Sequence, residues 1–72
     1  MTELDPKEKA IQLVDEHYTE IMDMGVTDEV LKAYAVKLAL ITVEKMYQVA
    51  VNLDEVRLMN YCGDVERELL NM

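Results

Sequence analysis

The sequence has very few of the residues that interrupt helices. Its 72 residues include two glycines and one proline. These residues mark turns and break regular elements, so their scarcity argues against a fold of many short strands. Apolar residues make up 51% of the chain, and no stretch shows the apolar–polar alternation of a strand bounded by turn residues. We therefore expect an all-α fold with long helices and short connections.

Cysteine and histidine are almost absent as well, since the chain contains only Cys62 and His17. One thiol excludes an intrachain disulfide and fits a reducing cytosol. A tight metal site needs three or four ligands, and nothing in the spacing of Cys62 and His17 makes them a nucleophile and its base. We interpret His17 as a surface or boundary residue and Cys62 as core. The sequence predicts no catalytic residue, no metal, no cofactor and no enzyme activity.

Basic residues are few, and the net charge is −8. Residues 1–29 carry a net charge of −7, residues 30–53 a net charge of +2, and residues 54–72 a net charge of −3. Binding to a nucleic-acid backbone depends on a basic patch, so direct nucleic-acid binding is not expected. An acidic surface suits a protein partner with a basic surface, although most small acidic domains are simply soluble.

The first helix has a clear start and a clear end. Asp5, Pro6 and Glu8 read as the N-cap, the first helical residue and the reciprocal capping acid. Gly25 is expected to end the helix by adopting a left-handed conformation. We predict a helix over about residues 6–24. Its apolar stripe comprises Ile11, Val14, Tyr18 and Ile21, widened by Ala10, Leu13 and Met22.

The second helix is long and apolar on two sides. Thr27 is its expected N-cap, and nothing breaks it over about residues 28–51, some 36 Å. One face carries Val36, Ala39, Leu40, Val43, Met46, Tyr47 and Ala50. The other carries Leu31, Tyr34, Leu38, Ile41 and Val49.

This helix is not expected to span a membrane, because a spanning helix needs about 20 apolar residues with few charges. Lys37, Glu44 and Lys45 interrupt the apolar stretch. The polar, acidic residues 1–5 also differ from a secretory signal peptide. We therefore expect a cytoplasmic protein.

The third helix is expected over about residues 53–71. Asn52 is its expected cap, with Glu55 three residues further on. An apolar repeat continues through Gly63 and favours one continuous helix, while the alternative is a break there with Asp64 capping a short final helix. The repeat consists of Leu58, Cys62, Val65, Leu69 and Met72.

Together these helices predict a three-helix bundle with a long central helix. Helices 1 and 3 each offer one apolar stripe, so a second chain is expected to complete the cover of helix 2. Tyrosine is enriched at interfaces. The candidate interface residues are Tyr34, Val36, Leu40, Val43, Met46, Tyr47 and Ala50.

Two alternatives to a protein-binding function remain open. One is a sponge that binds an anionic small molecule or a signalling nucleotide at a subunit interface, with Lys32, Lys37 and Lys45 as the candidate anion contacts. The other is a structural helical protein with no separate ligand.

Three segments also carry a resemblance to a group of proteins. They are Pro6–Ala10 with Asp15–Tyr18, Ala35–Lys45, and Tyr61–Leu69. In this order they resemble small uncharacterised helical proteins of gut Bacteroidetes bacteria and of the phages and prophages that infect them. Cys62 and Gly63 stand where that group tends to have Trp and Gln. The resemblance implies no activity; it implies only a phage-linked accessory protein acting in a bacterial cytoplasm. We expect such a protein to form a homo-oligomer and to bind a host or defence protein with a basic surface.

Overall fold

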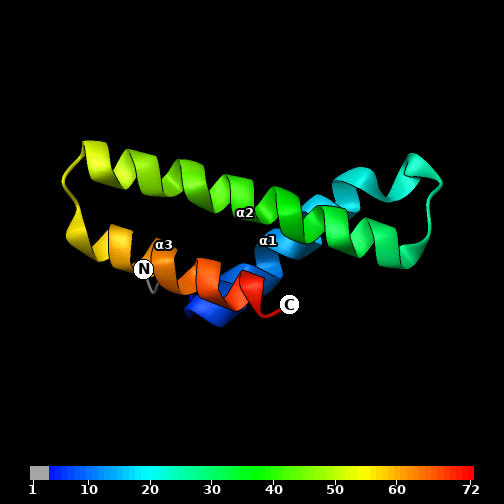
Figure 1. The fold of residues 1–72 in the computed structure, drawn as a ribbon, viewed down its shortest axis with the longest axis horizontal. Coiled ribbons are helices and arrows are strands. Elements are labelled where there is room, and N and C mark those ends of the chain that lie inside the picture. Colours follow the sequence, from blue (N-terminus) through cyan, green and yellow to red (C-terminus); the bar gives the residue numbers. More distant parts are fainter. Residues whose placement is uncertain (1–3) are drawn as a thin grey trace.

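The computed structural model describes residues 4–72, so the first three residues of the acidic N-terminal segment lie outside the description. Three α-helices make up the fold: α1 (Pro6–Ile21), α2 (Asp28–Asn52) and α3 (Val56–Leu70). A short 3-10 helix, η1 (Met22–Met24), follows α1. All three α-helices pack against one another, and residues 4–72 contain no strand, which confirms the predicted all-α three-helix bundle (Figure 1).

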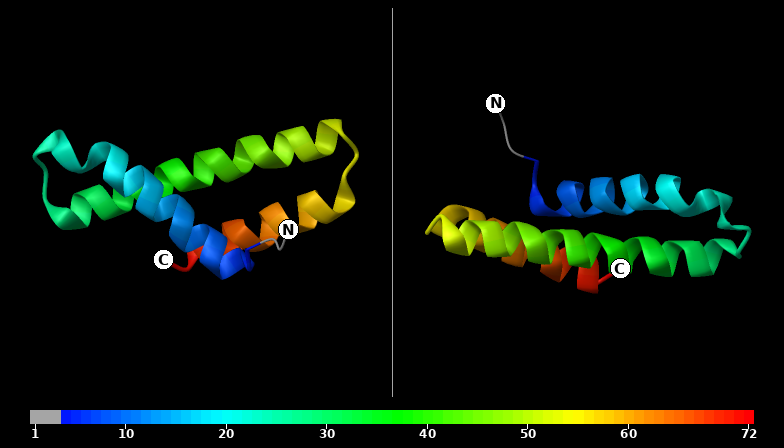
Figure 2. Two further views of the ribbon diagram at one scale, coloured as in Figure 1. Left: turned by 180° about the vertical axis from the view of Figure 1, so that it is seen from behind. Right: turned by 90° about the horizontal axis from the view of Figure 1, so that it is seen from above.

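The three helices form two layers. Helices α2 and α3 lie side by side and antiparallel, and α1 crosses one face of this pair (Figure 2). The molecule is elongated, with extents of 41 × 23 × 21 Å. The opposite face of the α2–α3 pair, seen in Figure 1, has no third helix over it.

Helix α1 begins at Pro6 with Asp5 as its N-cap, but the Asp5 side chain makes no capping hydrogen bond. The reciprocal cap predicted with Glu8 is therefore not formed. The α-helix ends at Ile21, three residues earlier than expected, because the chain tightens into η1, as helix ends often do. Gly25 follows with φ 74°, in the left-handed conformation predicted for it.

At the corner between α2 and α3, the residue that caps α3 differs from the predicted Asn52. Asn52 is the last residue of α2, and Glu55 is the N-cap of α3. The Glu55 N–H donates to Ala50 O at 2.9 Å, and the Asp54 N–H donates to Val51 O at 3.1 Å. This bond pair is a Schellman motif, with Asp54 at φ 55° in the left-handed position that glycine usually takes. Because the motif ends α2 after Asn52, Asn52 belongs to α2 and cannot be the N-cap of α3.

Helix α3 runs through Gly63 without a break, which confirms the continuous alternative. No helix in the described part of the chain is long and apolar enough to cross a membrane.

The core is built from small side chains. Eleven apolar residues are buried and four of them are alanines, while no aromatic side chain among residues 4–72 is buried. Ile11, predicted on the buried stripe of α1, is 44% exposed. The buried side of α1 is centred on Ala10, Leu13 and Val14, so two of the residues expected to widen the stripe form its centre. The buried residues are Ala10, Leu13, Val14, Leu31, Ala35, Ala39, Val43, Ala50, Cys62, Val65 and Leu69.

Replacing each glycine by alanine is expected to have opposite effects on stability. A Cβ at either position meets no atom within 4 Å, so only the backbone conformation decides. Gly63→Ala is expected to raise the free energy of unfolding by about 0.5–1 kcal/mol, because glycine is a poor helix former. Gly25→Ala is expected to lower it by about 1–2 kcal/mol, because the left-handed conformation disfavours a Cβ. Urea unfolding at one protein concentration, followed by circular dichroism, measures both changes. If both variants change the free energy of unfolding in the same direction, the backbone conformation does not decide these effects.

Candidate protein-interaction surface

Large apolar side chains lie mostly outside the core. Fifteen of them are exposed among the described residues, against the eleven buried apolar residues. Single exposed apolar residues are ordinary, but contiguous ones mark interaction sites. Two such stretches involve α2.

The first stretch, which we call the outer seam, lies along one side of α2. It consists of Val30, Tyr34 and Ile41, which are 41%, 49% and 43% exposed. Lys37 lies between them, so the positions recur at spacings of 4, 3 and 4, the spacing of helices that pair as a coiled coil. Val30, Tyr34 and Lys37 also line one shallow hollow together with Ala33.

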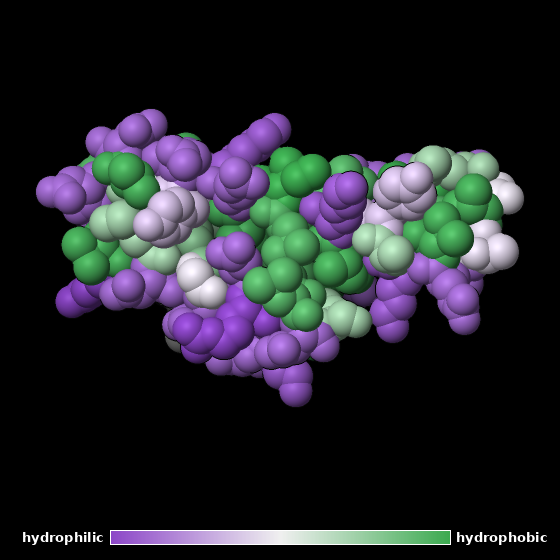
Figure 3. Space-filling model, in the orientation of Figure 1, coloured by the Kyte–Doolittle hydropathy of each residue, from purple (hydrophilic) through white to green (hydrophobic). Residues whose placement is uncertain are grey.

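The second stretch, which we call the α2–α3 groove, lies between these two helices. It holds a hollow of about 180 Å³ with no α1 residue in its lining, so it opens on the face away from α1. Apolar surface runs between the two helices on this face (Figure 3). The lining residues are Leu40, Val43, Glu44 and Tyr47 of α2, and Cys62, Glu66 and Leu70 of α3.

The structure divides the predicted interface residues into three groups. Val43 and Ala50 are 2% and 0% exposed, because neighbouring helices of the same chain cover them; Val43 only contributes to the floor of the groove, and Ala50 lines neither surface. Tyr34 and Tyr47 are exposed, one in the outer seam and the other in the groove. The remaining three residues are half-buried against the core: Val36, Leu40 and Met46.

The tyrosines differ in what they bond. Tyr18 Oη on α1 donates to the Asp28 carboxylate, which raises the pKa of Tyr18, with desolvation and the Asp28 charge adding to the effect. Tyr61 Oη on α3 donates to Leu4 O at 2.6 Å. Tyr34 and Tyr47 have no hydrogen-bond partner among the described residues. Their hydroxyl groups are therefore available to a binding partner.

The candidate anion contacts do not form one cluster. Lys32, Lys37 and Lys45 are all exposed. At 3.6 residues per turn, Lys32 lies about 140° around the helix axis from each of the others. Lys32 and Lys37 each line a hollow that also contains the acidic Glu29. Within one chain, this placement offers an anion no shared set of cations.

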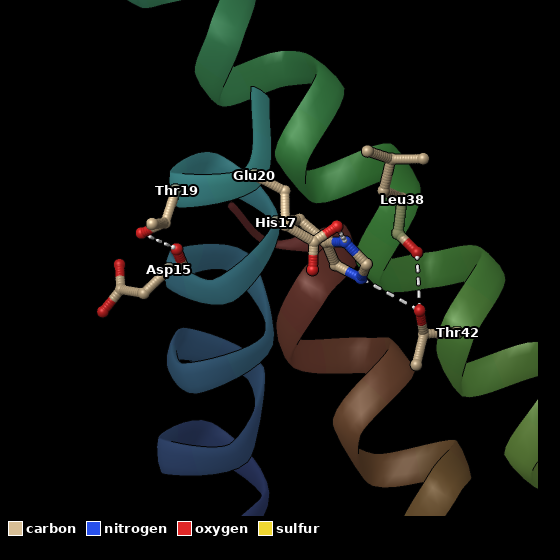
Figure 4. A network of polar contacts seen from close by, with 6 residues as sticks. All are labelled: Asp15, His17, Thr19, Glu20, Leu38 and Thr42. Carbon is tan, nitrogen blue, oxygen red and sulfur yellow. Dashed lines mark hydrogen bonds and ion pairs between the residues drawn. The ribbon is translucent and has the colours of Figure 1, made fainter. Parts of the chain in front are cut away.

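His17 joins α1 to α2 in a contact that the sequence did not predict (Figure 4). Its Nε2 lies 2.9 Å from Thr42 Oγ1, and the Thr42 hydroxyl lies 3.1 Å from Leu38 O. Because the hydroxyl donates its one proton to that carbonyl, it accepts from the Nε2–H. Nδ1 is buried without a hydrogen bond, 3.6 Å from Glu20 Oε2. In the described part of the chain, no three potential metal-ligand side chains gather.

Removing the Thr42 hydroxyl is expected to destabilise the protein. Thr42→Val keeps the shape of the side chain but leaves the His17 Nε2–H without an acceptor, which costs about 1–3 kcal/mol. The control is Thr19→Val, because the Thr19 hydroxyl is exposed and bonds only to Asp15 O within its own helix. It is expected to change stability by less than about 0.5 kcal/mol. Equal losses in urea unfolding contradict a specific role for the His17–Thr42 contact.

Cys62 lies beneath the groove and is 1% exposed. Its burial raises the pKa of the thiol, because desolvation disfavours the thiolate. The structure thus places Cys62 in the core, where the apolar repeat of α3 predicted it.

A thiol of this kind is expected to react slowly. In native protein at pH 8, a disulfide reagent such as Ellman's reagent should label Cys62 at least tenfold more slowly than in urea-unfolded protein, because the thiolate is the attacking species and is less populated in the fold. Absorbance at 412 nm follows the reaction. Equal rates in the native and unfolded states contradict the burial of this thiol.

The fold and its open surfaces define a small three-helix bundle that leaves apolar side chains of α2 and α3 uncovered. No protein-family model matches the chain, and neither a curated protein nor a solved structure is significantly similar to it.

Proposed function

We propose that this chain is a non-enzymatic helical interaction protein, which assembles with copies of itself and acts by binding another protein. One observation carries this proposal: large apolar side chains are more numerous on the surface than in the core. A core of small side chains stabilises a 72-residue chain weakly, and chains of this size usually gain support from a disulfide, a metal or a partner chain. Binding through the exposed side chains provides that support.

The outer seam supports self-association. Its spacing of 4, 3 and 4 brings three apolar residues to one side of α2, where the α2 of a second copy can pack against them. Lys37 interrupts the seam, and one polar residue in such a position selects a register at some loss of stability. Tyr34 at its centre adds apolar area together with a hydroxyl that has no partner within the described part of the chain.

Charge and resemblance support the choice of a separate protein partner. A net charge of −8 attracts a basic protein surface and opposes nucleic acid. The resemblance to helical proteins of Bacteroidetes and their phages favours a host or defence protein in a bacterial cytoplasm as the partner. The separated lysines give no support to an anion-binding sponge.

Self-association is tested by size-exclusion chromatography with light scattering at about 50 µM protein. The wild-type mass is expected to be that of two or more copies of the 8.3 kDa chain. Tyr34→Glu is expected to reduce it to that of one chain, because it places a charge in the apolar seam. A wild-type monomer overturns self-association.

Tyr47→Glu is the matched control, since Tyr47 has comparable exposure but lies outside the seam. It is expected to leave the mass unchanged. If Tyr47→Glu dissociates the assembly and Tyr34→Glu does not, copies associate through the groove instead of the seam.

A further inference from the structure

We infer that the α2–α3 groove binds an amphipathic helix of a partner protein that carries Lys or Arg on both borders of its apolar side. This inference rests on the proposed function and names the chemistry of the partner. The large apolar residues of the groove differ from those of the outer seam, although Ala33 borders both surfaces, so the two are tested with separate variants.

The shape of the groove suits a helix. Its lining continues along α2 into a second hollow, where Ala33, Val36 and Met72 are flanked by the oppositely charged Glu29 and Lys32. The stretch from Ala33 to Tyr47 is about 21 Å long, the length of about four helical turns. Because α1 lies on the opposite face, a helix in the groove would pack on the open side of the α2–α3 pair, as amphipathic helices pack into apolar grooves.

The charges in the groove determine what that helix must carry. Glu44 and Glu66 are the charged residues of the central hollow, and they come from different helices, α2 and α3. Neither has a hydrogen bond or an ion pair within the described residues. A bound helix takes water away from both carboxylates, which is costly unless it supplies cations to them. Lys or Arg on the two borders of its apolar side would do so.

A second copy of the chain suits the groove less well. Two copies docked groove to groove would bring two sets of Glu44 and Glu66 together, and like charges across an interface oppose association. Each copy also carries a net charge of −8. A basic partner removes both penalties.

The test is a selection from a displayed library of random 18-residue peptides, with the wild-type protein as bait. Enriched peptides are expected to carry apolar residues at helical spacing with Lys or Arg on both borders. Binding of these peptides, measured by fluorescence anisotropy at 150 mM salt, is expected to weaken about tenfold for Glu44→Gln/Glu66→Gln and for Leu70→Ser.

Two controls separate the groove from general charge attraction. Glu8→Gln/Glu16→Gln makes the same change in net charge on exposed positions of α1. Leu53→Ser removes a leucine that is 70% exposed, close to the 67% of Leu70, but lies at the corner outside the groove. Both are expected to change affinity less than twofold.

Several results overturn the inference. They are an absence of helical enrichment, enriched peptides without cations, and control variants that weaken binding as much as the groove variants. A fall in oligomer mass on Leu70→Ser means that a second copy fills the groove. If these results occur while Tyr34→Glu still dissociates the assembly, the groove inference fails and the proposed self-association stands.

Discussion

The contact of α2 with its two neighbours is made mainly through small side chains. Ala35, Ala39 and Ala50 are fully buried along its inner side, together with Val43. Alanine lets helices approach closely but buries little apolar area, so each contact contributes little free energy. The larger side chains of α2 are consequently left at its borders and on its outer side. Because small residues fill the inner side of α2, larger apolar residues remain exposed in the outer seam and in the groove.

Local signals predicted the helices well. Pro6 and Gly25 have conformational preferences that hold in almost any surroundings, so the start of α1 and the turn after η1 were predictable. The N-cap of α3 was not, because the backbone hydrogen bonds that close α2 place Asn52 within that helix and leave Glu55 as the cap. A capping hydrogen bond such as the one expected from Asp5 depends on side-chain geometry that the sequence pattern does not determine.

The inward side of each helix was predicted less well. Hydrophobicity placed Ile11 at the centre of the buried stripe and Ala10 at its edge, whereas the structure buries Ala10 fully and leaves Ile11 44% exposed. Val43 and Ala50 were expected at an interface between chains. The periodicity of α2 showed two apolar faces, but it did not show which face α1 and α3 of the same chain would cover. Tyr34 and Tyr47 were correctly expected on different sides of α2. The pairing of His17 with Thr42 depends on how two helices cross, and its one trace in the sequence is the polar Thr42 within an apolar face.

The alanine-lined interior gives the chain an unusual pattern of tolerance to substitution. At Ala35 or Ala39 any larger residue must force α2 away from its neighbours, so the fold constrains these positions most strongly. At Leu53 and Leu70, which are mostly exposed, the fold itself makes little demand. Divergence under selection for folding alone would therefore keep the alanines and lose the surface leucines. A diverged sequence that keeps Leu70 but not Leu53 would be under selection for what the groove binds.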